Sequence, residues 1–215
     1  KPMIWWVYQR AICAKTLSEV YVATDDGRIK EVCNKYNMKC VMTSDKHING
    51  SERLSEMSET IVADVYVTIQ GDEPLLEPIV IEKVVEVLLR DDKASCATLK
   101  TPYHNPVDVI NSTTPKVVVD LDDNALLFTR AAVPYPKDAL DFAIYKPIGV
   151  YAFWRDTIRR YKNLDMGPLE RAESIELLRL LEHGYKIKVG EVDSDTVAVD
   201  TPKDLERVRM YLKSK

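Results

Sequence analysis

Glycine is scarce in this chain, and its distribution excludes one common kind of nucleotide site. Only 7 glycines occur in 215 residues, and they are spread thinly along the sequence. Glycine-rich loops bind phosphates because their backbone N–H groups can approach the ligand closely. These residues therefore contain no phosphate-binding loop of that kind.

Long apolar runs, a strong charge of one sign and paired cysteines are lacking too. No apolar run approaches the length of a bilayer span, and no signal-peptide pattern occurs, so nothing indicates a membrane protein. The net charge of −4, with scattered Lys and Arg, argues against a general nucleic-acid binder. Cys13, Cys33, Cys40 and Cys96 form no Cys-x-x-Cys pair. This spacing favours reduced, buried thiols in a cytoplasmic protein over a disulfide framework or a zinc site.

The whole chain is long enough for one large domain or two small ones. Strand-like and helix-like segments alternate through its first half. Strands are predicted at 19–24, 39–43 and 65–70, and helices at 27–36, 51–60 and 78–90. The last of these helices places five apolar residues at helical spacing on one face. Alternation of this kind predicts a parallel sheet with helices on both faces.

The second half is richer in strands. Strands are predicted at 96–100, 116–120, 125–129 and 146–153, with a hairpin turn at 122–124. Helices at 155–162 and 170–182 and strands at 186–192 and 196–200 follow. The final helix has a clear start, because Thr201 suits the N-cap, Pro202 the first position and Asp204 the third.

The segment from Val65 to Pro74 is the most informative part of the sequence. Its run of β-branched and aromatic residues stops at Gly71, and the carboxylates of Asp72 and Glu73 follow directly. Ligands of open parallel sheets bind beyond the carboxyl ends of the strands, where hard oxygen ligands suit Mg²⁺ held together with phosphates. A strand followed by a solvated acidic turn explains the same residues equally well when this segment is taken alone.

The N-terminus lacks an expected strand. The chain opens at Lys1 and enters an apolar, helix-like run at 3–13 with no strand before it. In a doubly wound sheet the first strand is central, and the loop after it holds the phosphates. We therefore expect a first strand and its phosphate-binding loop upstream of Lys1; a native chain that begins at a helix is the alternative.

The segments from His47 to Leu54 and from Gln70 to Pro74, together with further segments in order along essentially the whole chain, resemble the 3-deoxy-manno-octulosonate (Kdo) cytidylyltransferases. The segment from His47 to Leu54 is similar to the family's His-x-Ser-Gly-Thr-(Asp/Glu)-Arg motif, with Asn49 and Ser51 as conservative replacements. Residues 70–74, Gln-Gly-Asp-Glu-Pro, are identical to its metal-site motif. The other segments that carry the resemblance are 1–4, 22–26, 127–130 with 133–135, 148–151, 169–176 and 199–206.

The resemblance implies a fold class and a reaction. The fold would be α/β, a Rossmann-like (GT-A-like) nucleotidyltransferase. It would form a three-layer α/β/α sandwich around a mostly parallel mixed sheet, with an antiparallel strand-rich insertion. Residues 1–215 would form one domain, in which 96–153 is the sugar-acid and dimer region. The expected reaction couples CTP to the anomeric hydroxyl of a sugar acid in a Mg²⁺-dependent homodimer, without nucleic acid or membrane partners.

The same resemblance implies roles for individual residues. Asp72 and Asp200, about 130 residues apart, would be catalytic and would hold Mg²⁺. Asp200 could instead be only a helix-terminal acid. Arg53 would bind the acceptor carboxylate, although a solvated arginine paired with Glu52 or Glu56 explains it without the family. The remaining predicted substrate contacts are Gln70, Glu73, His47, Ser51, Arg130, Glu173 and Glu176.

Four of these contacts, His47, Arg130, Glu173 and Glu176, have simpler explanations. His47 could be a structural or exposed loop residue, and Arg130 could close its turn. Glu170, Glu173 and Glu176 recur every third residue and would form one ridge of a helix, which indicates a polyhydroxyl or cationic partner. A solvated face, with Arg171 and Arg179 offsetting the charge, is the alternative.

Two departures from the family pattern leave the function open. The family's phosphate-binding loop has no counterpart here, so a non-catalytic nucleotide-sugar-binding homologue is one alternative; the paired Asp72 and Asp200 argue against it. Pro147 stands where the family usually has a His associated with the sugar acid. The same chemistry on 8-amino-Kdo, another sugar acid or a phosphonate is therefore a second alternative. A uridylyl- or guanylyltransferase fits the resemblance less well.

Overall fold

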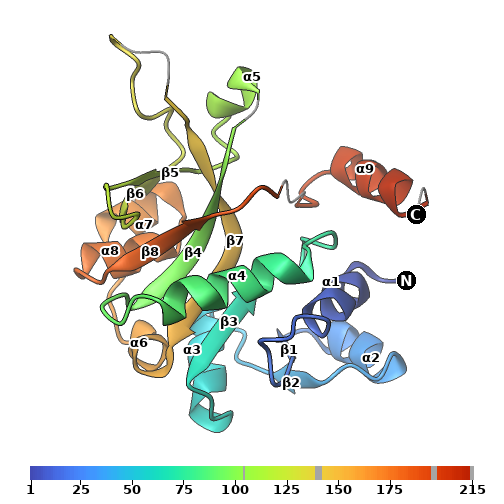
Figure 1. Cartoon of the computed structure of the whole chain (residues 1–215). Helices are drawn as coiled ribbons and strands as arrows, with labels where there is room; N and C mark the ends of the chain where they lie inside the picture. The colour runs from blue at the N-terminus through green and yellow to red at the C-terminus, as the bar shows by residue number, and fades with distance from the viewer. Residues whose placement is uncertain (104, 139–141, 195–197, 214–215) are drawn as a thin grey trace.

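The computed structural model of the protein describes residues 1–103, 105–138, 142–194 and 198–213 and has the predicted α/β architecture (Figure 1). Its helices are α1 Met3–Ala11, α2 Gly27–Lys35, α3 Gly50–Thr60, α4 Pro78–Leu89, α5 Pro106–Val109, α6 Arg155–Tyr161, α7 Pro168–Glu173, α8 Leu177–Glu182 and α9 Pro202–Lys213. Its strands are β1 Val22–Thr24, β2 Cys40–Met42, β3 Val65–Ile69, β4 Cys96–Pro102, β5 Lys116–Val119, β6 Ala125–Thr129, β7 Tyr145–Trp154 and β8 Ile187–Glu191.

The main sheet is mixed and is organised around the long strand β7. Strands follow the order β6-β5-β7-β4-β8, and β3 pairs with the C-terminal half of β7. β3, β4 and β5 all run antiparallel to β7, whereas β8 runs parallel to β4. The mixed sheet is confirmed. The strands β3, β4, β5 and β8 of this sheet point the same way, whereas β6 and β7 point the other way, as expected for a mostly parallel mixed sheet. β7 is inserted between β3 and β4.

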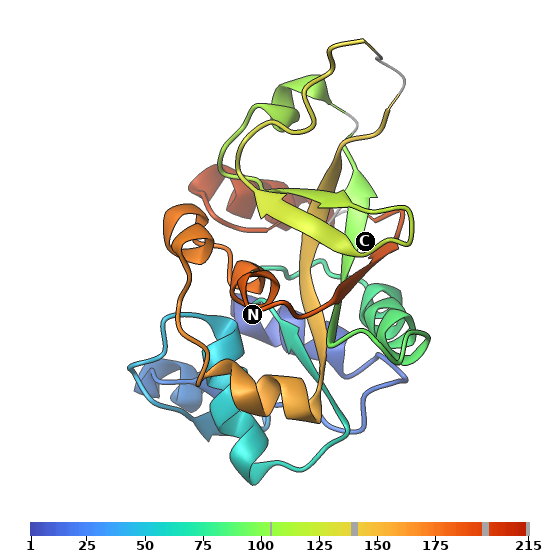
Figure 2. The ribbon, with the colours of Figure 1, turned by 90° about the vertical axis from the view of Figure 1, so that its left-hand side faces the viewer.

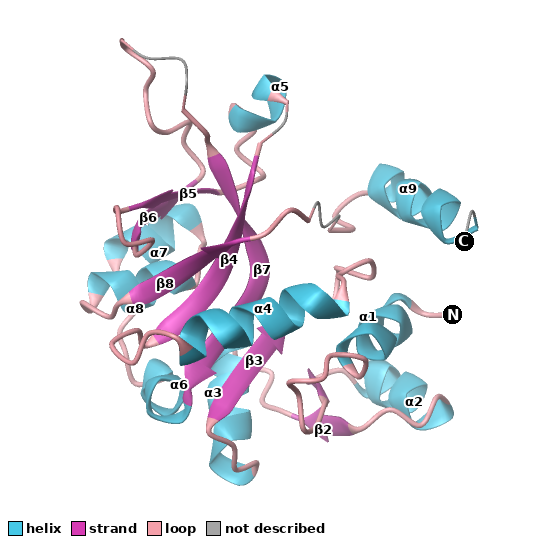
Figure 3. Cartoon of the chain, in the orientation of Figure 1, coloured by secondary structure: helices cyan, strands magenta, loops and turns pink. Residues whose placement is uncertain are grey.

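Alternating residues of β7 face two different helical layers. Ile148, Val150 and Ala152 are buried in one core cluster together with the apolar side chains of α4. Phe153 belongs to the other cluster, with the buried residues of α6 and α8. Because the side-chain period of a strand is two, a strand with both faces covered must be apolar at nearly every position. The predicted three-layer arrangement follows from these two cores (Figures 2 and 3).

The amphipathic helix α4 covers one face of the sheet as its sequence predicts. Its apolar stripe is fully or almost fully buried: Val80, Ile81, Val84, Val85 and Leu88. Pro78 occupies the first turn, where its missing N–H would be unsatisfied in any case. Burying such a stripe against the sheet is the main contribution that a helix of this length receives from tertiary packing.

The short strands β1 and β2 form a separate parallel sheet beside the main one. A cavity of about 1060 Å³ lies between this pair and β3, lined by residues 16–23 on one side and 61–71 on the other. Within the described ranges, β1 pairs only with β2 and β3 only with β7, so each strand has an open edge. The expected first strand would lie between these edges, and its existence stays a prediction.

The predicted helix over 170–182 is divided in two. Ser174 adopts a left-handed conformation with φ 53°, and it separates α7 from α8. Glu176 is the N-cap of α8. The expected single ridge of glutamates is therefore wrong, since a left-handed residue redirects the helix axis.

The C-terminal elements follow the predicted capping pattern. The Thr201 N–H and hydroxyl both donate to Asp204 Oδ2, at 2.9 and 2.7 Å, and the Asp204 N–H donates back to Thr201 Oγ1. This reciprocal capping box begins α9 as expected. The strand predicted at 196–200 falls partly outside the described residues, and the described 198–200 form no strand.

The strand-rich region 96–153 extends beyond the body of the molecule. The hairpin turn between β5 and β6 is confirmed, because the Asp120 N–H donates to Asn124 O at 2.9 Å. The connections around 105–115 and 131–138 project from one end of the sheet in both Figures 1 and 2.

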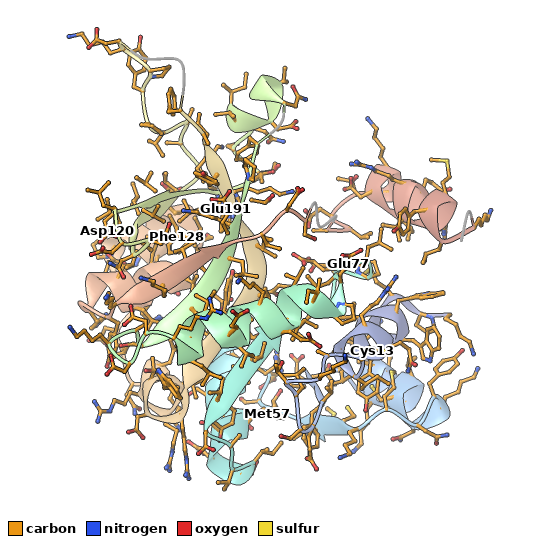
Figure 4. All side chains as sticks on the ribbon, viewed as in Figure 1. Cys13, Met57, Glu77, Asp120, Phe128 and Glu191 are labelled. Carbon is orange, nitrogen blue, oxygen red and sulfur yellow. The ribbon has the colours of Figure 1, made fainter. Side chains whose placement is uncertain are left out.

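The cysteines are unpaired, but one prediction about them is wrong. Cys33 and Cys96 are buried, whereas Cys13 is exposed just after α1, where Figure 4 labels it. The exposure of Cys13 follows from its place in the turn that ends α1. No helix within the described ranges has both the length and the apolar character that crossing a membrane requires.

Candidate active site

Two carboxylates predicted to act together, Asp72 and Asp200, are brought close by a backbone hydrogen bond. Asp72 lies in the turn that follows the C-terminal end of β3. The Val199 N–H donates to Asp72 O at 2.9 Å, so the segment before α9 passes directly over this turn (Figure 3). Asp200, the next residue, is exposed, and Asp72 is half-buried.

The electrostatics of this pair favour a bound cation. Burial raises the pKa of Asp72 above its ordinary value, and the negative charge of Asp200 raises it further. No cluster of three or more potential His, Cys, Asp or Glu ligands occurs among the residues the structure describes. Mg²⁺ needs few protein ligands, because it keeps several waters and binds substrate phosphates. Two carboxylates therefore suit Mg²⁺ better than they suit a metal whose ligands all come from the protein. These residues therefore fit the implied ion.

Glu73, the second carboxylate of the turn, is turned into the protein. Only 6% of the residue is exposed, and Oε2 has no hydrogen-bond partner in the described structure. Burial and the charge of Asp72 raise the pKa of Glu73 to about 7. A Cβ atom at position 149 would lie 2.7 Å from Glu73 Oε1, so a side chain there would displace the buried Glu73 carboxylate. Glu73 lines neither cavity described here, so the structure does not place it at the surface where its predicted substrate contact would form.

A polar cavity of about 640 Å³ opens beside Asp72. It lies between the turn after β3, the start of α3, the end of β6 and the α7–α8 connection. Its polar and charged lining residues are Asn49, Gln70, Asp72, Arg130, Tyr151, Glu170, Arg171, Ser174 and Glu176. Gln70, Arg130 and Glu176 are thus predicted contacts that the structure brings together.

The turn that begins α3 is fixed from both sides. Asn49 is its N-cap, and Oδ1 accepts the Glu52 N–H at 2.9 Å. The amide nitrogen of Asn49 donates to Glu170 Oε1 at 3.2 Å and to the Tyr161 hydroxyl at 3.3 Å. Residues 48–50 line both cavities, so this turn separates them.

Glu176 organises the floor of the smaller cavity. Its carboxylate accepts the Ser51 N–H at 2.8 Å and the Gln70 side-chain amide at 3.4 Å. Burial raises the pKa of Glu176, and the N–H of Ser51 works against that rise. Ser51 itself is fully buried and lines neither cavity, so the structure does not support its predicted substrate contact. A residue in the first turn of α3 that faces the core cannot reach the opening.

Arg179 is a buried cation, whereas the sequence analysis allowed it to offset the glutamate charge on a solvated face. Its guanidinium forms a fork with Glu170 at 2.6 and 2.8 Å, and Nη1 donates to Glu52 Oε1 at 2.9 Å. It also lies 4.6 Å from the centre of the Tyr161 ring. The signal in the sequence is an arginine inside the apolar run Leu177–Leu181, since a buried arginine needs carboxylate partners.

Arg53 and His47 lie on the other cavity. Arg53 donates to the Thr43 hydroxyl and to Ser44 O, and its Nη2 pairs with Asp25 at 3.3 Å. His47 is hydrogen-bonded to the Glu56 carboxylate. Both line the cavity of about 1060 Å³ and neither lines the one beside Asp72. The structure therefore does not bring Arg53 to the predicted acceptor site.

Glu173 and Arg130 hold each other across the end of β6. The Glu173 carboxylate accepts the Thr129 hydroxyl at 2.6 Å and the Arg130 N–H at 2.8 Å. These hydrogen bonds and the positive charge of Arg130 hold the pKa of Glu173 below its ordinary value. Arg130 lines the smaller cavity, but Glu173 does not.

Comparison with known proteins places this geometry in a family. Residues 1–187 match the profile of the family described as Cytidylyltransferase. A 3-deoxy-manno-octulosonate cytidylyltransferase of Koribacter versatilis is 42% identical over 216 residues, which cover 100% of this chain and 82% of that protein. An 8-amino-3,8-dideoxy-manno-octulosonate cytidylyltransferase of Shewanella pealeana is 42% identical over 209 residues, which cover 95% of this chain and 85% of that protein.

Solved structures agree. A structure of CMP:2-keto-3-deoxy-manno-octonic acid synthetase complexed with CTP matches with a TM-score of 0.94 and 37% identity, over 100% of this chain and 88% of that one. A glucose-1-phosphate thymidylyltransferase from Bacillus anthracis has a TM-score of 0.68 at 14% identity, over 98% of this chain and 82% of that one, and shows the fold alone. With a family profile over most of its length and full-length relatives of this similarity, the chain belongs to the cytidylyltransferase family.

Proposed function

We propose that this protein transfers the cytidylyl group of CTP to the anomeric hydroxyl of Kdo or a closely related sugar acid. The observation that carries the proposal is the meeting of Asp72 and Asp200 beside a polar cavity. The acceptor oxygen would attack the α-phosphorus, and the bond to the β-phosphate would break. CMP-sugar and pyrophosphate would form, and the hydroxyl proton would be released. Such products are precursors of lipopolysaccharide or surface polysaccharide.

Asp72 and Asp200 would hold Mg²⁺, which would supply positive charge to the phosphates and lower the pKa of a nearby hydroxyl. Phosphoryl-type transfer depends mainly on positioning and on electrostatic stabilisation of the charged phosphorus centre. The chain's own contribution is therefore to fix two carboxylates at one point, through the hydrogen bond from the Val199 N–H to Asp72 O. Gln70 is the next polar side chain back along the same turn and faces the acceptor cavity.

The cavity beside Asp72 suits a polyhydroxylated acid. Asn49, Gln70, Tyr151 and Glu176 offer both donors and acceptors along its wall. Asn49 is fixed by its hydrogen bonds to Glu170 and Tyr161, and Glu176 by those from the Ser51 N–H and the Gln70 amide, before any ligand arrives. Preorganised polar groups select a ligand with matching hydroxyls, because a mismatch would leave buried groups unpaired.

8-Amino-Kdo is a second candidate acceptor. Relatives named for Kdo and for 8-amino-Kdo are equally similar to this chain, at 42% identity each. Pro147, on β7 opposite Lys100, also departs from the family's usual His. We expect Kdo to be the better acceptor; a higher kcat/KM for 8-amino-Kdo in a panel at saturating CTP and Mg²⁺ would reverse the order.

We also propose that the protein acts as a homodimer in the cytoplasm. The support is the resemblance, together with four cysteines that are all unpaired. The projecting connections around 105–115 and 131–138, with exposed Val107, Ile110 and Tyr135, are the surface we assign to the dimer. Light scattering after gel filtration should give twice the chain mass, and a single-chain mass would contradict the assignment.

A further inference from the structure

The proposed function implies an acceptor with a carboxylate, and the inference about which residue binds that carboxylate rests on it. A cationic side chain in the pocket is the strongest partner for a carboxylate. Among the described residues that line the cavity beside Asp72, the cations are Arg130 and Arg171. The same wall carries Asp72, Glu170 and Glu176, so an unaccompanied carboxylate ligand would be repelled. Among the described residues, these two arginines are therefore the candidates to offer charged donors to the ligand.

Arg130 has few donors left. Its Nε donates to Glu173 O at 2.8 Å, and its Nη1 donates to Ser112 O and Thr113 O at 3.0 and 2.7 Å. A bidentate pair with a carboxylate needs two adjacent N–H groups on one edge of the guanidinium. Either such edge of Arg130 includes Nε or Nη1, and both already donate to backbone carbonyls. Arg130 thus closes its turn, which was the simpler of its two predicted roles.

The other arginines near the pocket are committed as well. Arg179 is 2% exposed, and its Nε, Nη1 and Nη2 all donate to carboxylates of Glu170 and Glu52. Arg53 lies on the other cavity, where it pairs with Asp25. Arg179 cannot turn toward the acceptor without leaving the buried Glu170 carboxylate unpaired, which is strongly destabilising. Arg53 does not line the cavity beside Asp72.

Arg171 differs from all three. It is exposed on the short helix α7, and in the described structure its side chain makes a single hydrogen bond, from Nη2 to Met166 O at 3.3 Å. Within the described ranges it forms no ion pair, so it does not offset the neighbouring glutamates as the sequence analysis had allowed. Glu170, beside it, is already paired with Arg179. The edge formed by Nε and Nη2 is open apart from that one long bond.

We propose that Arg171 binds the carboxylate of the sugar-acid acceptor through a bidentate, charge-assisted hydrogen-bond pair. Its neighbours hold it in place for this task. Pro168 begins α7 and the left-handed Ser174 ends it, so the helix presents residue 171 at the cavity rim. A planar guanidinium matches a carboxylate in a way that lysine cannot, so the assignment is specific to arginine.

The test compares Arg171→Gln and Arg171→Lys with wild type, using Kdo and its neutral methyl ester. For Kdo, kcat/KM should fall about 10- to 100-fold in Arg171→Gln, mainly through KM, and less in Arg171→Lys. The KM for CTP should be unchanged. For the methyl ester, as substrate or as competitive inhibitor, wild type and Arg171→Gln should agree within about twofold, since the ester has no charge to bind.

Arg159→Gln is the matched control, because Arg159 is an exposed arginine on α6 that lies outside this cavity. It should leave every constant at the wild-type value. Wild-type kcat/KM for Kdo in Arg171→Gln, or an equal loss with Kdo and its ester, would overturn the inference alone. Wild-type protein that does not use Kdo would overturn the proposed function, and the inference with it.

Discussion

Among single residues, Asp72 and Asp200 matter most for the proposed activity. Burial and the charge of Asp200 raise the pKa of Asp72, so the two carboxylates oppose each other in the protein alone. A cation that joins them would turn this repulsion into binding energy. Repulsion that persists in the folded protein is typical of functional sites rather than of structural ones.

Replacing Asp72 or Asp200 should lower activity without lowering the stability of the fold. Asp72→Asn and Asp200→Asn should each lower kcat by at least about 100-fold. Thermal unfolding without Mg²⁺ should show a Tm equal to or above that of wild type, because the repulsion is removed. Near wild-type kcat in either variant would remove that residue from the proposed metal site, and a large fall in Tm would make its role structural.

Glu173 provides a prediction about pH. Its pKa is lowered by the hydroxyl of Thr129, by the N–H of Arg130 and by the Arg130 charge. A carboxyl with a lowered pKa stabilises the folded state above its unfolded pKa of about 4.5, and that contribution is lost as the pH falls below it. The free energy of unfolding of Glu173→Gln should therefore be about 1–2 kcal/mol lower than that of wild type at pH 7. This difference should shrink toward pH 3. Thermal unfolding across this range is the measurement, and a difference independent of pH would contradict the assigned ionisation.

The positions of site residues were predictable where the backbone fixes them, and their roles stay predictions. Asp72 follows a strand directly, and Asp200 precedes a capping box, so both positions follow from strong local signals. The sequence alone did not show that Arg53 faces the larger cavity and Ser51 the core, because both lie on a helix whose faces meet cavities or core. Which face a helix turns toward a site depends on its tertiary partners, and no local pattern records that.

At the scale of elements, the link between α3 and α8 is the feature with most effect on the site. Arg179 on α8 pairs with Glu170 on α7 and with Glu52 on α3, and Glu170 in turn accepts the amide of Asn49. Three helices are thereby connected around the turn that separates the two cavities. The connection is made in the interior, where electrostatic interactions are strong and unpaired charges are costly.

Removing the cation should expose this dependence. Arg179→Met leaves the buried Glu170 without its partner, and we expect a loss of about 3–5 kcal/mol in the free energy of unfolding, measured in urea. The double variant Arg179→Met with Glu170→Gln removes both charges and should recover more than half of that loss. Equal stability of the single and double variants would show that the fork with Glu170 is not the source of the effect.

The sequence predicted the elements with strong periodicity and missed those set by single backbone angles. The apolar stripe of α4 specifies one helix with one buried face, and the structure has it. The break at Ser174 depends on a left-handed φ of 53° at a serine, which carries no strong local signal. The insertion of β7 between β3 and β4 pairs segments about 80 residues apart, and it is decided by long-range packing.

At the scale of the whole molecule, two cavities meet at residues 48–50 and Gln70. The smaller one has the carboxylates, the polar wall and Arg171, as expected for an acceptor site. The larger one lies between β1 and β3, whose edges on that side are unpaired within the described ranges. The first strand that the sequence predicts would lie between these two edges, and it stays a prediction.

The proposed transfer of the cytidylyl group from CTP to a sugar acid can be tested by following the products of one incubation. The intact natural protein would be mixed with CTP, Mg²⁺ and Kdo, and ³¹P NMR would follow the phosphorus species. The account predicts equal amounts of pyrophosphate and of a new phosphodiester, both dependent on Kdo and Mg²⁺, and far less of either when UTP replaces CTP. Pyrophosphate without the phosphodiester, or neither product with Kdo or 8-amino-Kdo, would contradict it.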